Sequence, residues 1–229
     1  MRPGKASSPL VSRRACLGAV VGGIGLLPAM GQLAGCRSSR PKPVDFSETP
    51  RHFDPDNYRE VFDRWTRHAR LVSANEGAII ELWATLKSWE FREAYVEKYA
   101  QAYALSREDK ASLRTAEMEK ARSFYDFHLT VQTTDFRWND LQKRDSTWRI
   151  SLNDGTGDET FPSDVESMKL PVPYELVFFP EKTAFSRSYS VRFDKPETSE
   201  PGNAGPVSGE LALRVAGPLG NVQVSWIAK

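Results

Sequence analysis

The residue types that most often carry chemistry are few and scattered in this sequence. Its three histidines, His52, His68 and His128, are far apart, and no two have the spacing that places two zinc ligands on one helix face. We expect structural or surface roles for them and predict no metal site. Glu90 and Glu93 could form a carboxylate pair, but acids in the first turn of a helix also favour the positive end of its dipole. The sequence therefore identifies no catalytic residue and no cofactor.

Oxygen donors gather in residues 153–159, which read Asn-Asp-Gly-Thr-Gly-Asp-Glu. The cluster could in principle bind calcium, but it lacks the alternating donor spacing of a calcium loop. It also stands where a hairpin must turn, so we interpret it as a turn. The sequence contains no glycine-flanked serine elbow, phosphate loop or dinucleotide fingerprint.

Tryptophan and arginine recur together, as at Arg137-Trp138. Such a mixture can form cation-π contacts and can line a groove for a polar ligand. Core packing with arginine head groups reaching solvent is the simpler interpretation. Residues 136–140 form an irregular stretch between two runs predicted as strands. Arg137, Trp138 and Asp140 are therefore the candidate ligand patch.

Residues 1–36 have the layout of an export signal. Basic residues come first, at Arg2, Lys5, Arg13 and Arg14. A thin, glycine-rich apolar stretch follows from Ala15 to about Leu27, shorter than the roughly 20 apolar residues of a membrane span. We expect residues 1–35 to be a signal peptide that is cleaved between Gly35 and Cys36.

The four residues Leu33-Ala34-Gly35-Cys36 resemble the lipobox of bacterial lipoproteins. The resemblance implies a diacylglyceryl thioether on Cys36 and acylation of the new amine. Several acyl chains anchor stably, since each buried methylene contributes about 0.8 kcal/mol. The expected partner is thus the membrane, reached through an N-terminal lipid. Arg37, and not Asp, follows the cysteine, which favours the outer membrane of the cell envelope, on its periplasmic or surface face.

Residues 12–18, Ser-Arg-Arg-Ala-Cys-Leu-Gly, also resemble the twin-arginine export motif, with Cys16 in place of Phe and Gly18 in place of Lys. Equally, the two arginines can simply provide the positive charge of an ordinary export signal. The sequence leaves the twin-arginine route and the general export route both open. Cys16 would leave with the signal, and lipid would cap Cys36. The mature domain would then contain no thiol for disulfides, metal sites or nucleophilic catalysis.

The charge balance argues against a nucleic-acid partner. The chain has 31 Lys and Arg against 30 Asp and Glu, and residues 1–35 hold basic residues but no acid. The mature part is therefore slightly acidic, and it has no dense basic run. With 40% hydrophobic and 11% aromatic residues, it can bury a sizeable core.

We expect three parts: the signal at 1–35, a polar, proline-bearing tether at 36–55, and a single domain at 56–229. A short helix with one apolar face opens the domain, with Tyr58, Val61, Phe62 and Trp65 on that face. Residues 77–87 are ambiguous, because their propensity allows a helix while their apolar residues alternate. We favour a strand, paired with residues 71–73 across a turn.

A helical hairpin is predicted at about 88–123, with Ser88 capping one helix and Ser106 the next. Alternating runs follow at 129–133, 148–152, 174–178, 189–193, 211–215 and 222–226. These runs predict an α+β fold, an Ig-like antiparallel β-sandwich with the hairpin inserted. Residues 195–208 are expected to form an exposed loop.

Residues 62–67, 87–95 and 137–140 are similar to segments of uncharacterised bacterial lipoproteins. That resemblance supports the lipid anchor and supplies no site. We expect a lipid-anchored envelope protein that binds a protein partner or supports an assembly. The alternative is an envelope enzyme, or a polysaccharide-binding module that uses tryptophan and arginine side chains.

Overall fold

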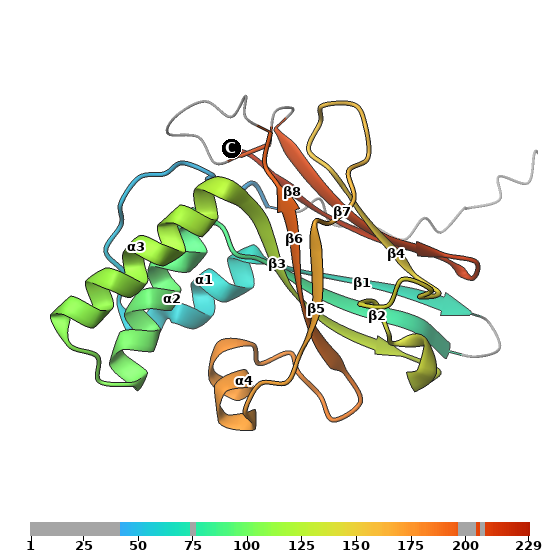
Figure 1. Cartoon of the computed structure of the whole chain (residues 1–229), viewed down its shortest axis with the longest axis horizontal. Helices are drawn as coiled ribbons and strands as arrows, with labels where there is room; N and C mark the ends of the chain where they lie inside the picture. The colour runs from blue at the N-terminus through green and yellow to red at the C-terminus, as the bar shows by residue number, and fades with distance from the viewer. Residues whose placement is uncertain (1–41, 74–76, 197–204, 207–208) are drawn as a thin grey trace, which may run out of the picture. The chain divides into compact units, whose positions relative to one another are not determined.

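The computed structural model describes residues 42–73, 77–196, 205–206 and 209–229. Signal residues 1–35, the lipidation site Cys36 and most of the predicted 195–208 loop lie outside this range. Two antiparallel sheets, of five and three strands, and four α-helices make up the described part (Figure 1). The predicted α+β class is confirmed. An Ig-like sandwich is not confirmed by these strand orders.

The larger sheet has the strand order β1-β2-β3-β6-β5. Its strands are β1 (Thr66–Ser73), β2 (Gly77–Leu86), β3 (Phe124–Thr133), β6 (Arg187–Asp194) and β5 (Asp164–Met168). The ambiguous segment 77–87 is thus a strand, as its alternation predicted, and Leu71 pairs with Ile80 in the expected hairpin. The smaller sheet has the order β4-β7-β8, with β4 (Arg149–Asn153), β7 (Glu210–Gly217) and β8 (Gly220–Ile227).

The inserted helical hairpin is confirmed as α2 (Trp89–Ala102) and α3 (Arg107–Ser123). The Ser88 hydroxyl accepts the Phe91 N–H at 3.2 Å, and the Ser106 hydroxyl accepts the Asp109 N–H at 3.0 Å. These side chains satisfy N–H groups that the first turn of a helix leaves without partners. The helix α1 (Tyr58–Trp65) also matches its prediction, because its four apolar residues are buried.

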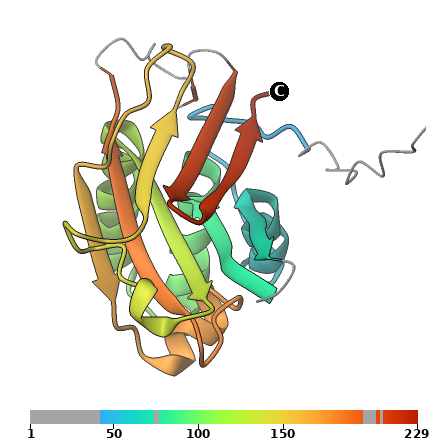
Figure 2. The ribbon, with the colours of Figure 1, turned by 90° about the vertical axis from the view of Figure 1, so that its right-hand side faces the viewer.

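The apolar core lies between the two sheets. Leu82, Leu129 and Tyr189 occupy one face of the large sheet and are fully buried. Phe127, on the same face, meets Trp226 of the small sheet with ring centroids 5.4 Å apart. Figure 2 shows the small sheet in front of the large one, with the helices behind. The apolar face of the large sheet is thus covered by the small sheet.

The opposite face of the large sheet is polar, and along β3 it is also buried, whereas Glu166 on the edge strand β5 is exposed. Asp126, His128 and Thr130 alternate with the apolar residues of β3 and are covered by the helical layer. Across the sheet, Asp126 pairs with Arg192, and His128 pairs with Ser190. This polar layer, and not the apolar core, holds the candidate site.

The prediction of a strand at 174–178 is wrong, because these residues belong to the helix α4 (Val172–Phe178). Pro173 stands in the first turn, where its missing N–H costs nothing. Tyr174 and Phe178, four residues apart, lie against each other with centroids at 4.6 Å, while Leu176 is 62% exposed. The polar edge strand β5 was not predicted, because Asp-Val-Glu-Ser-Met shows little apolar alternation.

Part of the predicted tether at 36–55 packs on the domain. Val44 and Phe46 are buried, and Val44 forms a parallel bridge with Ala228 beside β8. The Val44 N–H donates to the Ile227 carbonyl at 2.8 Å, and the Lys229 N–H donates to the Val44 carbonyl at 3.0 Å. Because the segment is rich in proline and polar residues, the sequence did not predict that Val44 and Phe46 would be buried. Residues 36–41 lie outside the described range.

Candidate functional site

A cavity of about 170 Å³ lies between the helical hairpin and the polar face of the large sheet. Four cationic and three anionic side chains line it, together with aromatic residues. The charged residues are Lys87, Arg92, Lys120, Arg192, Glu117, Asp126 and Glu166. They come from α2, α3, the sheet and the short link between β2 and α2, so the hairpin must pack on the sheet to assemble the cavity.

Arg92 is the centre of the cluster, and its side chain is only 1% exposed. Its guanidinium forms ion pairs with Glu117 of α3 and, at 2.6 Å, with Asp126 of β3. Its Nε donates to the Lys87 carbonyl at 2.9 Å. Because a buried guanidinium needs partners for its fixed fork of donors, these contacts tie both helices to the sheet.

Lys87 and Asp126 form a second buried ion pair, with Nζ 3.3 Å from Oδ1. Burial lowers the pKa of Lys87, and the nearby Asp126 charge opposes that shift only partly. Burial alone would raise the pKa of Asp126, but the charges of Lys87 and Arg92 outweigh it, so this pKa is lowered. Asp126 is therefore a fixed carboxylate.

Glu117 is held in the same way from the helical side. Lys120 donates to it at 2.7 Å, and Arg92 pairs with its other oxygen. Burial would raise the pKa of Glu117, but these two cations lower it. Both inner carboxylates thus have their oxygens engaged by cations.

Aromatic residues form the apolar part of the wall: Phe91, Tyr95, Tyr174 and Phe179. The hydroxyls of Tyr95 and Tyr174 share a hydrogen bond of 2.9 Å between α2 and α4. Burial raises the pKa of Tyr95 far above its ordinary value, so its hydroxyl stays protonated. The cavity therefore offers charge on one side and ring surface on the other.

His128 lies behind this wall. Its ring stacks on Phe179 with centroids 3.6 Å apart, and neither ring nitrogen has a hydrogen-bond partner among the described residues. Burial, followed by the charge of Lys87, holds its pKa well below the usual 6.5. His128 is thus a neutral buried imidazole that Phe179 separates from the cavity.

The three residues of the predicted patch, Arg137, Trp138 and Asp140, differ in exposure. Arg137 is 87% exposed and pairs with Asp135, while Trp138 is half-buried in the short 3₁₀-helix Phe136–Trp138. Asp140 is buried, and it accepts the Ser146 hydroxyl at 2.9 Å. The structure therefore places Asp140 in a loop-closing role and leaves the arginine and tryptophan at the surface.

The remaining sequence candidates occupy structural positions. Glu90 accepts the Trp65 indole N–H at 2.8 Å, and Glu93 accepts Arg114 at 2.9 Å. His68 stacks on Trp83 at 4.7 Å. In the 153–159 segment, Asp154 accepts the Thr156 N–H at 3.1 Å, as in a turn. No group of three or more potential metal-binding side chains occurs within residues 42–73, 77–196, 205–206 and 209–229.

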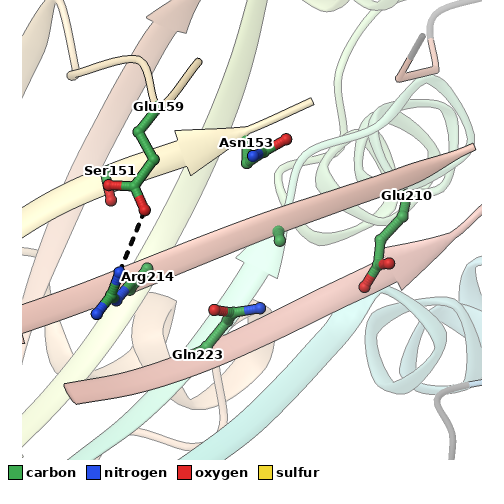
Figure 3. A pocket seen from close by; sticks show the side chains of 7 residues that line it. Ser151, Asn153, Glu159, Glu210, Arg214 and Gln223 are labelled. Atoms are coloured by element: carbon green, nitrogen blue, oxygen red, sulfur yellow. Dashed lines mark hydrogen bonds and ion pairs between the residues drawn. The ribbon is translucent and has the colours of Figure 1, made fainter. Parts of the chain in front are cut away.

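A second hollow, of about 260 Å³, lies on the outward face of the small sheet (Figure 3). Its lining is polar, with Glu159 and Arg214 paired at 3.2 Å. Arg214 is 40% exposed, and no aromatic ring contributes to the lining. The hollow lacks the buried charges and ring surface of the cavity beside Arg92, which is therefore the stronger candidate.

Comparisons of the chain with protein-family models, curated proteins and solved structures found no match. None of the helices that the structure describes has both the length and the apolar character needed to span a bilayer.

Sequence reasoning missed Arg92, Glu117 and Asp126. The signal for Asp126 and His128 was present in residues 124–133, where polar residues alternate with large apolar ones in a strand covered on both faces. Polar residues in a strand indicate a site only if both faces of that strand are buried, because a buried polar group needs a partner. The sequence alone did not show that both faces of this strand are buried. No sequence pattern indicated that Arg92 and Glu117 would meet them.

Proposed function

We propose that the protein is a lipid-anchored cell-envelope protein that acts by binding, with its ligand site in the cavity beside Arg92. The observation that carries the binding role is the cavity itself, a charged and aromatic recess assembled from the hairpin and the sheet. Pockets of this composition, with a few fixed polar groups and apolar walls, are typical of ligand sites.

The fixed ion pairs support recognition over proton transfer. Arg92 holds Glu117 and Asp126 as carboxylates, and both have lowered pKa values. A general acid or base at neutral pH needs a pKa near the working pH. These groups instead form a preorganised charged frame, which suits the positioning of a ligand.

The anchor rests on the sequence. Leu33-Ala34-Gly35-Cys36 follows basic and apolar segments in the order and at the distance of a lipoprotein signal. Under this proposal Cys36 carries the lipid, and the domain that begins near Val44 lies in the envelope, at the outer membrane.

Acyl labelling tests the anchor directly. Labelled fatty acid should be incorporated into the wild-type chain, and Cys36→Ser should abolish the label and leave a precursor about 3 to 4 kDa larger. Cys16→Ser is the matched control and should still be labelled. Wild-type protein without label would refute the anchor.

A polysaccharide-binding role is a second candidate, supported by the exposure of Arg137 beside the half-buried Trp138. An aromatic ring next to a cation can hold a sugar by stacking and hydrogen bonding. Saturable binding of cell-wall fragments that Trp138→Ala abolishes would favour it. Binding that instead depends on Arg192 would assign the ligand site to the cavity.

A further inference from the structure

We propose that the cavity beside Arg92 binds a small organic anion, a carboxylate joined to an apolar body of about one aromatic ring. This inference rests on the proposed binding function and specifies its ligand. It depends on which polar groups of the cavity still have hydrogen-bonding capacity.

The charge of the lining favours an anion. Its four cationic side chains exceed its three carboxylates by one. The two inner carboxylates, Glu117 and Asp126, are both occupied by cations. The third, Glu166, is exposed, where solvent and salt screen it. A cationic ligand would therefore meet only one carboxylate of the lining without an ion pair among the described residues, the exposed Glu166.

The cations, in contrast, keep donors for a ligand. Lys87 has three N–H donors, and among the residues that the structure describes it meets only the two oxygens of Asp126, at 3.3 and 3.4 Å. Within the described part of the chain, the carboxylate nearest to the Arg192 guanidinium is that of Asp164, at 3.6 Å, beyond hydrogen-bond distance. Arg192 can thus turn a bidentate pair of donors toward an incoming carboxylate.

Ser190 adds a neutral donor. Its side chain is buried and lines the cavity, and its hydroxyl makes no hydrogen bond to any residue that the structure describes. It lies on the same sheet face as Asp126 and Arg192, two residues before the latter on β6. The Ser190 hydroxyl is not among the fully buried atoms without a partner, so it remains accessible from the cavity and can donate to a ligand oxygen.

The apolar side sets the size of the body. Phe91, Tyr95 and Tyr174 present ring surface, and the cavity volume is about 170 Å³. An apolar protein cavity of about 150 Å³ accommodates benzene. One ring or a short aliphatic chain therefore fits, and a large oligosaccharide does not.

Isothermal titration calorimetry of the purified protein with benzoate, benzyl alcohol and benzylamine tests the inference. The three probes share a ring and differ in charge. Benzoate should bind saturably, and the neutral and cationic probes should bind about tenfold more weakly or less. Benzylamine binding tighter than benzoate would overturn the anion assignment and leave the cavity as a binding site.

Variants place the binding in the cavity. Arg192→Gln and Ser190→Ala should each weaken benzoate binding, Arg192→Gln by about tenfold. Arg214→Gln is the matched control. The Arg214 side chain is 40% exposed, nearly the same as the 39% of Arg192, but Arg214 lies on the small sheet, outside the cavity. Benzoate binding unchanged by Arg192→Gln would overturn the proposal. If none of the probes binds, both the anion assignment and the cavity's binding role fail, whereas acyl labelling tests the anchor separately.

Discussion

The two faces of the five-stranded sheet are both buried along its central strand β3, but they are built on opposite principles. Leu82, Leu129 and Tyr189 form an apolar face that packs on the small sheet. Asp126 and His128, from the same strand as Leu129, form a polar face under the helices. One strand therefore supplies the stabilising core with one set of residues and the candidate site with the other.

The comparison indicates how stability and binding are divided. Apolar burial is non-directional and tolerates a range of side chains of suitable size. Buried charges must be paired, and the loss of one partner leaves another charge without compensation. The polar face should thus be sensitive to particular partners, whereas the apolar face should be sensitive mainly to polarity and volume.

The largest effect is expected from a charge on the apolar face. Leu82→Asp should unfold the domain, because burying an unpaired carboxylate costs several kcal/mol against a total stability of about 5 to 15 kcal/mol. Glu81→Lys, one residue earlier and partly exposed beside His68, should change the free energy of unfolding by about 1 kcal/mol or less. Urea unfolding followed by circular dichroism measures both. A folded Leu82→Asp protein would contradict the placement of this face.

An intermediate effect is expected on the polar face. Arg92→Met should lower the free energy of unfolding by about 3 to 5 kcal/mol, because Glu117 and Asp126 lose their shared cation. Arg59→Met removes an arginine that is 56% exposed, and should cost about 1 kcal/mol or less. Adding Glu117→Gln to Arg92→Met should recover part of the loss, because Lys120, the other cation paired with Glu117, is 49% exposed and can be solvated. If Arg92→Met and Arg59→Met lower the free energy of unfolding equally, the buried ion pairs of Arg92 contribute no more than surface pairs, and this prediction is wrong.

The smallest effect concerns His128 and depends on pH. Its pKa is depressed in the folded state, so the unfolded chain binds the proton more readily. The neutral imidazole is tolerated above pH 6.5, and stability falls as the pH drops below that value, by about 1.4 kcal/mol per pH unit. His128→Phe should flatten this decline.

The same substitution should slightly stabilise the protein at pH 7, by about 1 kcal/mol, because it removes two ring nitrogens that have no partner among the described residues. Thermal unfolding at pH 7.0 and pH 5.0 gives both quantities. His52→Phe, outside the buried layer, is the control for the pH dependence. If His128→Phe keeps the full decline between the two pH values, His128 is not its source.

Much of the fold was predictable because periodicity and capping are local. The alternation of residues 77–87 outweighed their helical propensity, since a strand with neighbours on both sides buries one set completely. Residues 174–178 misled the prediction, because Tyr174 and Phe178 satisfy a spacing of two and a spacing of four equally well. Pro173 indicated the correct structure there, because proline is favoured in the first turn of a helix.

The candidate site was not predictable from local patterns. Arg92 meets Glu117 25 residues away and Asp126 34 residues away, and no spacing rule joins a helix, a second helix and a strand. The Arg137 and Trp138 patch was chosen for residue type and for its irregular position between two predicted strands, and these two signals indicate exposure but not a cavity. Burial, which depends on the whole fold, distinguishes a surface arginine from one in a cavity.

The bridge between Val44 and β8 has a mechanical consequence. A pulling force applied to the chain at residue 42 acts first on the two backbone hydrogen bonds of Val44 and on the burial of Val44 and Phe46. It reaches the smaller sheet through β8, whereas Arg92 and Asp126 belong to the hairpin and the larger sheet. Tension on the N-terminal side is thus borne first by the small sheet at Val44, and it passes to the helices through Phe46, which packs on Trp65 of α1 with ring centroids 5.3 Å apart.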